Sequence, residues 1–131
     1  MTLRSALVVE DEFLIAEEMK AFLEEHGWRV IGPAYRSSQA LDLIAAEAPT
    51  ITVLDLVLGD QVATELAQTL RRMQVPTILV TGWDVIDGPL AELPIIRKPI
   101  DFPTLLSTAN ALAPAPPRPT IRRITGRPSE G

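Results

Sequence analysis

The sequence contains no cysteine and a single histidine, His26. Without cysteine there is neither a disulfide framework nor thiolate chemistry, and His26 has no second histidine with which to build a metal site. No stretch is apolar over the length of a membrane span. The first apolar run is short and leads directly into three acidic residues, Glu10 to Glu12, which is not the pattern of a signal peptide. We therefore expect a cytoplasmic protein.

Basic residues are in the minority, with 12 lysines and arginines against 17 acidic residues and a net charge of −5. Because a phosphate backbone calls for a basic face, nucleic acid is not an expected partner. The length of 131 residues and the apolar content of 47% are those of one ordinary globular domain with a real core.

The composition changes after residue 113. Residues 114–131 hold five of the twelve prolines, four arginines and one acidic residue. Proline at this density excludes a helix, so we expect residues 1–113 to form the domain and residues 114–131 to be a disordered Pro/Arg-rich tail. A second interpretation, that the tail is a docking segment, stays open.

Strand-like runs and helix-like patterns alternate along the chain. The expected strands are 6–9, 28–31, 51–54, 77–80 and 95–96, and the expected helices are 14–27, 41–48, 62–73 and 105–112. Between residues 84 and 94, Gly88-Pro89 leaves room only for a short or broken helix. Strict alternation predicts an α/β fold, a doubly wound (βα)5 parallel sheet of the flavodoxin-like kind. The second strand ends in Gly32-Pro33 rather than in a polar residue, which favours the strand order 2-1-3-4-5.

Polar residues stand where four of the five expected strands end. Glu10 and Asp11 follow the first strand, Asp55 the third, Thr81 the fourth and Lys98 the fifth. In a parallel sheet these ends share one edge, where ligands bind, and the second strand contributes nothing there. We therefore expect the five side chains to gather in one site.

Three carboxylates in one site repel one another, and a magnesium ion would remove the conflict. We expect Asp11 and Asp55 to bind the ion directly and Glu10 to bind it through water. The backbone carbonyl of Val57, just beyond Asp55, could complete the ligands that the protein supplies.

Asp55 can also act as a nucleophile, because carboxylates form aspartyl-phosphate intermediates. The ammonium of Lys98 can then share the phosphoryl oxygens with the metal, and the Thr81 hydroxyl can donate a hydrogen bond to a third oxygen.

This set of residues resembles the receiver domain of two-component response regulators over residues 4–113. The resemblance rests on four motifs, which are Glu10-Asp11, Asp55, Thr81-Gly82 and Lys98-Pro99. It implies that Asp55 is the phosphoacceptor for a histidine kinase or a histidine phosphotransferase. It also implies that Glu10 and Asp11 are the acid pair of a Mg²⁺ site, that Thr81 is the switch hydroxyl and that Lys98 senses the phosphoryl group.

Further details of the resemblance concern the segment around the last strand. The family's Lys–Pro bond, here Lys98–Pro99, is typically cis. Receivers often carry an aromatic switch residue three positions before the lysine, where this chain has Ile95, so coupling through a rotating ring is not expected. Loosely, the chain also resembles stand-alone receivers with a Phe-Ala-Thr-Gly-type motif, of which it matches only Thr81-Gly82.

We therefore expect a single-domain response regulator that accepts a phosphoryl group from a phosphohistidine onto Asp55 in a Mg²⁺-dependent reaction. It would signal or relay by protein–protein contact, and it would not be an enzyme beyond its own phosphorylation and dephosphorylation.

One alternative is a receiver-like interaction module that is not phosphorylated. Another is a nucleotide- or flavin-binding enzyme, which would need a glycine-rich turn where Asp11-Glu12-Phe13-Leu14 stands.

Overall fold

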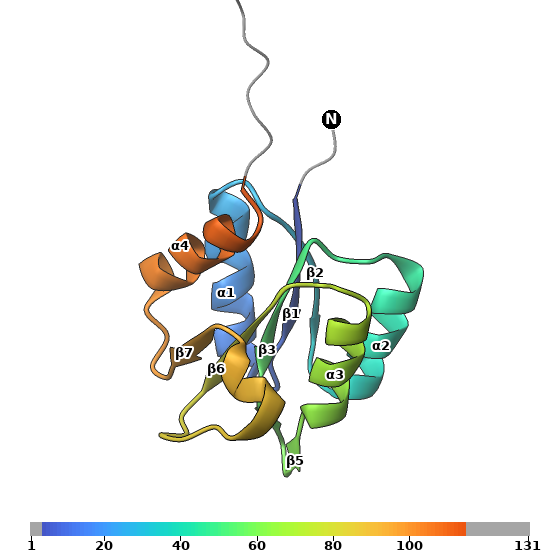
Figure 1. Ribbon diagram of the computed structural model, residues 1–131. Helices are drawn as coiled ribbons and strands as arrows, with labels where there is room; N and C mark the ends of the chain where they lie inside the picture. The colour runs from blue at the N-terminus through green and yellow to red at the C-terminus, as the bar shows by residue number, and fades with distance from the viewer. Residues whose placement is uncertain (1–3, 115–131) are drawn as a thin grey trace, which may run out of the picture.

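A parallel sheet with helices on both faces forms the body of the protein in the computed structural model, which describes residues 4–114 (Figure 1). Its five strands, given in spatial order, are β2 (Arg29–Ala34), β1 (Ser5–Val9), β3 (Ile51–Asp55), β6 (Thr77–Thr81) and β7 (Ile95–Arg97). All neighbouring pairs are parallel. Counted within this sheet the order is 2-1-3-4-5, so the predicted fold class is confirmed.

The three central strands β1, β3 and β6 are buried along their whole length. Continuous apolar runs, rather than alternating ones, are what strands covered on both faces require. The sequence therefore located these strands to within about one residue.

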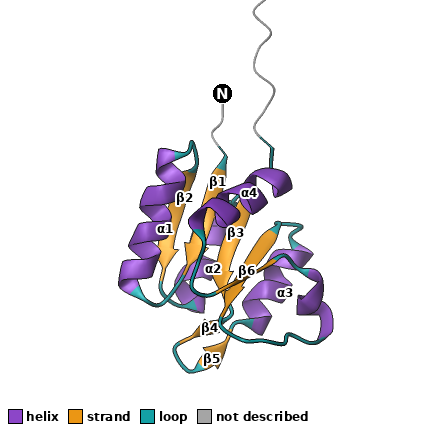
Figure 2. Cartoon of the chain, turned by 90° about the vertical axis from the view of Figure 1, so that its left-hand side faces the viewer, coloured by secondary structure: helices purple, strands orange, loops and turns teal. Residues whose placement is uncertain are grey.

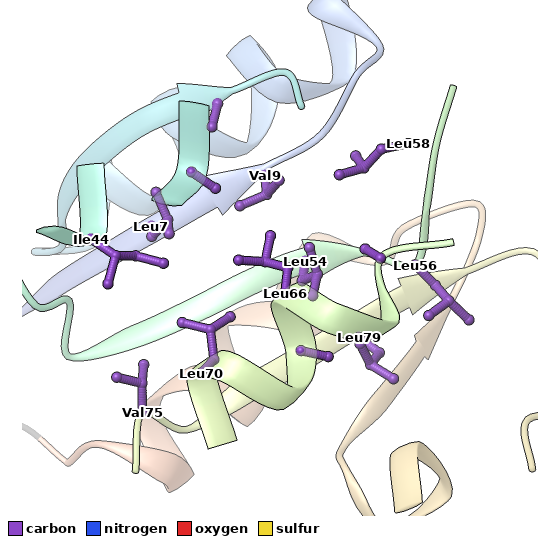
Figure 3. Close-up of a cluster of buried hydrophobic side chains, with 14 of the residues drawn as sticks. Leu7, Val9, Ile44, Leu54, Leu56, Leu58, Leu66, Leu70, Val75 and Leu79 are labelled. Atoms are coloured by element: carbon purple, nitrogen blue, oxygen red, sulfur yellow. The ribbon is translucent and has the colours of Figure 1, made fainter. Parts of the chain in front are cut away.

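Helices α1 (Phe13–Glu25) and α4 (Phe102–Leu112) cover one face of the sheet. Helices α2 (Ser37–Ala46) and α3 (Thr64–Arg72) cover the other, together with the short 3₁₀ helix η1 (Gly88–Glu92) (Figures 1 and 2). Leucines of β1, β3 and β6 pack against Leu66 and Leu70 of α3 on that second face (Figure 3). On the first face Met19 and Leu23 of α1 lie in one cluster with Leu105 of α4.

Helix α1 ends at Glu25, two residues before the expected end, and His26 is its C-cap residue. His26 Nδ1 lies 2.8 Å from the Phe22 carbonyl oxygen. Gly27 follows with φ of +90°, a left-handed conformation that glycine adopts without strain. The single histidine thus closes a helix.

A small hairpin between β3 and α3 was not predicted. Its strands β4 (Val57–Leu58) and β5 (Gln61–Val62) pair antiparallel around Gly59, whose φ is +65°. Consequently α3 begins at Thr64, two residues later than expected. Val62, which we had assigned to the apolar stripe of that helix, is an exposed strand residue.

The second strand is also longer than predicted. It runs from Arg29 to Ala34 and includes Gly32, at φ of +91°, and Pro33. Its pairing with β1 shifts by one residue between Leu7 and Val9. The positive φ of Gly32 lets the strand bend and continue where the sequence suggested an end.

Two further expectations concern membrane spans and the C-terminal tail. None of the helices within residues 4–114 is both long and apolar enough to cross a membrane. The Pro/Arg-rich tail lies outside the described residues apart from Pro114, so the boundary at residue 113 stays a prediction.

Candidate phosphoryl and metal site

All five predicted side chains lie at the carboxyl edge of the sheet. The strand register aligns Val9 with Leu54, Asp55 with Val80, and Thr81 with Arg97. The residues at or just after these positions, Glu10, Asp11, Asp55, Thr81 and Lys98, therefore come from neighbouring strand ends.

The second strand supports this edge through its backbone. The Glu10 amide donates a hydrogen bond of 2.9 Å to the Ala34 carbonyl oxygen. We had expected β2 to contribute nothing here, and it supplies no side chain, but its last residue fixes the backbone of an acidic residue.

The acidic cluster consists of Glu10, Asp11 and Asp55, each of which offers a carboxylate oxygen within 4.8 Å of the others. Glu10 and Asp55 are buried, whereas Asp11 is exposed. The buried Oε1 atom of Glu10 accepts no hydrogen bond from any described residue. An oxygen-only donor set with one unsatisfied buried oxygen fits a hard divalent cation such as Mg²⁺.

Burial raises the pKa of Glu10 from 4.5 to about 7. The hydrogen bond from the Glu12 amide to Glu10 Oε2 lowers it, and the neighbouring charge of Asp55 raises it further. Burial, more than the neighbouring charge of Asp55, is therefore the main reason that this carboxyl has a raised pKa.

Lys98 is the cation that the protein itself provides. Its Nζ lies 2.9 Å from Asp55 Oδ2 and 3.4 Å from Glu10 Oε1. Burial acts to lower the pKa of Lys98, but the hydrogen bond and charge of Asp55, followed by Glu10, leave the pKa raised. The Lys98–Pro99 bond is cis, as the resemblance implied.

The β4–β5 hairpin is tied to the two aspartates. Asp55 Oδ1 accepts a hydrogen bond of 3.1 Å from the Val57 amide, and Asp11 Oδ2 accepts one of 2.7 Å from the Gly59 amide. The sequence indicated Val57 only as a carbonyl ligand, which stays a prediction. It gave no sign of the contact between Asp11 and Gly59, which are 48 positions apart.

Thr81 is buried at the end of β6, and its Oγ1 accepts a hydrogen bond of 3.0 Å from the Trp83 amide. Because that bond uses a lone pair, the hydroxyl hydrogen can still be donated to a ligand. The Lys98 amide donates to the Thr81 carbonyl oxygen at 2.8 Å, so the two strand ends are fixed side by side.

The loop after Thr81 is held from the other side by Arg97. Its guanidinium donates to Asp84 Oδ1 at 2.9 Å and to the Asp84 carbonyl oxygen at 2.8 Å. Trp83, which lies between these two anchors, is about half exposed at the edge of the site.

Comparison with known proteins agrees with this geometry. The family model of the response regulator receiver domain matches residues 6–110. A CheY-like response regulator receiver domain from Methylobacillus flagellatus is 25% identical at a TM-score of 0.75. That alignment covers 85% of this chain and 99% of the other.

Two further solved structures are similar. The PhyR stress response regulator is 26% identical at a TM-score of 0.72, over 88% of this chain and 48% of that one. The signal receiver domain of a modulated diguanylate cyclase from Desulfovibrio desulfuricans G20 is 24% identical at a TM-score of 0.75. It is matched over 85% of this chain and 94% of its own, and this likeness concerns the fold alone.

Proposed function

The chain belongs to the response regulator receiver family of two-component signalling, and from that premise we propose that Asp55 accepts a phosphoryl group in a Mg²⁺-dependent reaction. The proposed donor is a phosphohistidine on a histidine kinase or a histidine phosphotransferase. The observation that carries the proposal is the position of Asp55, a buried carboxylate with Lys98 at 2.9 Å and two further carboxylates within 4.8 Å.

In the proposed step, a carboxylate oxygen of Asp55 attacks the phosphorus of the phosphohistidine. A P–O bond forms as the P–N bond breaks, the electron pair of that bond stays on the imidazole nitrogen, and the product is an acyl phosphate. The protein's contribution is position and charge, because this transfer needs little covalent chemistry from other side chains.

Asp11 and Asp55 are the proposed direct ligands of the metal, with the Val57 carbonyl completing the set and Glu10 acting through water. When bound there, Mg²⁺ supplies positive charge that offsets the carboxylates and the phosphoryl oxygens. The unsatisfied Glu10 Oε1 supports this assignment.

Lys98 and Thr81 are the proposed partners of the transferred group. Lys98, which now pairs with Asp55, would share its charge with a phosphoryl oxygen. Thr81, whose Oγ1 already accepts from the Trp83 amide, would donate its hydroxyl hydrogen to another. Their attachment to adjacent strand ends supports a response that spreads to the loop at residues 82–87.

The proposed output is protein–protein contact by a single-domain cytoplasmic regulator, as a relay or as a direct signal. Residues 4–114 contain the proposed phosphoacceptor site and form one sheet with its helices, with no second folded unit among them.

The direct test is to incubate the protein with acetyl phosphate or a phosphorylated histidine kinase and then to measure its intact mass by mass spectrometry. The native protein should gain one phosphoryl group only when Mg²⁺ is present. Asp55→Asn keeps the shape but loses the nucleophilic oxygen, so it should gain none. Asp60→Asn, an aspartate of the nearby hairpin turn, is the matched control and should be labelled normally.

The competing function is an interaction module that is never phosphorylated. Native protein that remains unlabelled by several donors, while Mg²⁺ still binds, would favour that alternative. Labelling of Asp55→Asn at the native rate would move the phosphoacceptor to another residue.

A further inference from the structure

The crossover between β6 and β7 leaves part of the sheet thinly covered. The other connections in the sheet contain α-helices, whereas this one contains only the five-residue helix η1. A groove of about 560 Å³ lies between α3 and η1 as a result. Figure 1 shows α3 and η1 next to each other on the same face of the sheet.

The floor of the groove is apolar and open to solvent. Leu90 and Leu93 pack against the core with part of each side chain exposed. Ala67 and Pro89 complete this floor. An apolar strip between two helical walls has the shape that an amphipathic helix fills.

One wall of the groove is basic. Arg71 and Arg72, adjacent at the end of α3, both line it. Arg71 contacts Glu92 across the groove at 3.0 Å, in a pair that is largely exposed and so is easily exchanged for another acid. Arg72 donates only to Thr69 of its own helix and has no acidic partner within 4.0 Å among residues 4–114.

We propose that the α3–η1 groove is a docking site for an acidic amphipathic helix of a partner protein. Leucine-like side chains of that helix would cover Leu90 and Leu93, and its acidic side chains would face Arg71 and Arg72. The charge argument is local, since a protein of net charge −5 otherwise repels an acidic partner. The groove contains none of the site residues, so the proposal does not depend on phosphorylation of Asp55.

The test uses a synthetic, fluorescein-labelled peptide of about 18 residues, a length sufficient for partial helix formation. Leucines at i, i+3, i+4 and i+7 form one face, and glutamates flank them. Binding to the full, unphosphorylated chain is followed by fluorescence anisotropy. We expect saturable binding that weakens as salt is added, and a peptide with lysines in place of the glutamates should bind at least about fivefold more weakly.

Two variants and one control locate the peptide. Arg72→Glu should weaken binding about fivefold or more, because an attractive pair becomes a repulsive one. Arg36→Glu makes the same charge change at an exposed arginine before α2 and should leave affinity within about twofold. Gln68→Trp adds bulk at an exposed position of the groove without changing charge, and it should also weaken binding.

Amide chemical shifts complete the test. The glutamate peptide should move the signals of residues 67–72 and 88–93. Shifts confined to α1 and α4, equal binding of the lysine peptide, or equal loss in Arg36→Glu and Arg72→Glu would each overturn the proposal. So would a concentration-dependent dimer of the protein alone that Gln68→Trp abolishes, because the occupant would then be a second copy.

Discussion

The two ends of the sheet treat their polar groups in opposite ways. At the amino end, the Arg4 guanidinium lies over the ring of buried Trp28, 4.3 Å from its centroid. It also donates to Asn110 Oδ1 and to the Ala113 carbonyl oxygen. Trp28 Nε1 donates to the same Asn110 oxygen at 3.2 Å, so charge, ring and amide all have partners.

At the carboxyl end, buried acidic groups lie close together and are not fully compensated. Glu10 is fully buried with an oxygen that accepts no hydrogen bond from residues 4–114, and Asp55 and Asp11 lie within 4.8 Å. Lys98 is the one cation in contact with the two buried acids among those residues. One edge of the sheet therefore gives its buried tryptophan and the polar groups around that ring partners, whereas the other leaves a buried carboxylate oxygen without a hydrogen bond from any described residue.

Trp28→Ala should have the largest effect on the free energy of unfolding. Truncation of a buried aromatic side chain costs about 3–5 kcal/mol, and here the stacking of Arg4 and the hydrogen bond to Asn110 are also lost. Urea unfolding measures the loss. Mg²⁺ affinity of the folded variant should be unchanged, because Trp28 belongs to the amino end. A loss below about 1 kcal/mol would mean that this end contributes little.

Lys98→Ala should destabilise the metal-free protein by about 2–3 kcal/mol at pH 8. This is below the cost of breaking a fully buried pair, because the side chain is partly exposed. The pKa of Lys98 is raised above its ordinary value of 10.5 in the folded protein. Its contribution to the free energy of unfolding is therefore complete below pH 10.5, and it is lost only as the pH rises through the folded-state pKa.

The Lys98 variant should recover part of its stability with Mg²⁺, which thermal unfolding would detect. Lys20→Ala, on α1, removes a lysine that pairs with no acid among the described residues and is the control. Equal destabilisation of both variants would contradict a specific role for Lys98 at the acidic edge.

Glu10→Gln, unlike Lys98→Ala, should stabilise the metal-free protein, by about 1–2 kcal/mol at pH 8. The pKa of Glu10 is raised from 4.5 to about 7, so the folded state holds this proton more tightly than the unfolded state does. Native stability should therefore fall as pH rises between these values and stay lower above about 7. The gain from glutamine should vanish below pH 4.5, and a gain independent of pH would refute this account.

The smallest expected effect is a change in Trp83 fluorescence when Mg²⁺ binds at the carboxyl end of the sheet. The Trp83 amide donates to Thr81 Oγ1, and the residue is about half exposed. Metal bound by Asp11 and Asp55 changes the local field and water structure, so Trp83 fluorescence should change saturably with Mg²⁺. The signal should persist in Trp28→Phe and vanish in Asp11→Asn. A response carried by Trp28 would show that the two ends are coupled.

The sequence predicted the sheet from its alternating pattern, and it predicted the five site side chains because four of the five buried runs end at polar residues. Strand order then brought Glu10 beside Asp55, as the register confirms in the alignment of Val9 with Leu54. Such an inference needs only the direction of the strands and the edge at which they end.

The hairpin could not be predicted in the same way. Two-residue strands have no readable period, and Val62 fits the apolar stripe of the following helix as well as it fits β5. The hydrogen bond from Gly59 to Asp11 joins distant positions through a backbone amide, which leaves no trace in residue type.

Gly32 and Pro33 have a consequence for assembly. They interrupt β2, which is one outer strand of the sheet. A Cβ at Gly32 would lie 2.7 Å from the Ala34 nitrogen and 3.3 Å from the Val8 oxygen, so the bend admits no larger residue. Pro33 offers no N–H, and the opposite outer strand, β7, spans only three residues. A foreign strand therefore finds no continuous row of donors and acceptors at either margin. Both edges are therefore poor templates for pairing with the strand of another molecule.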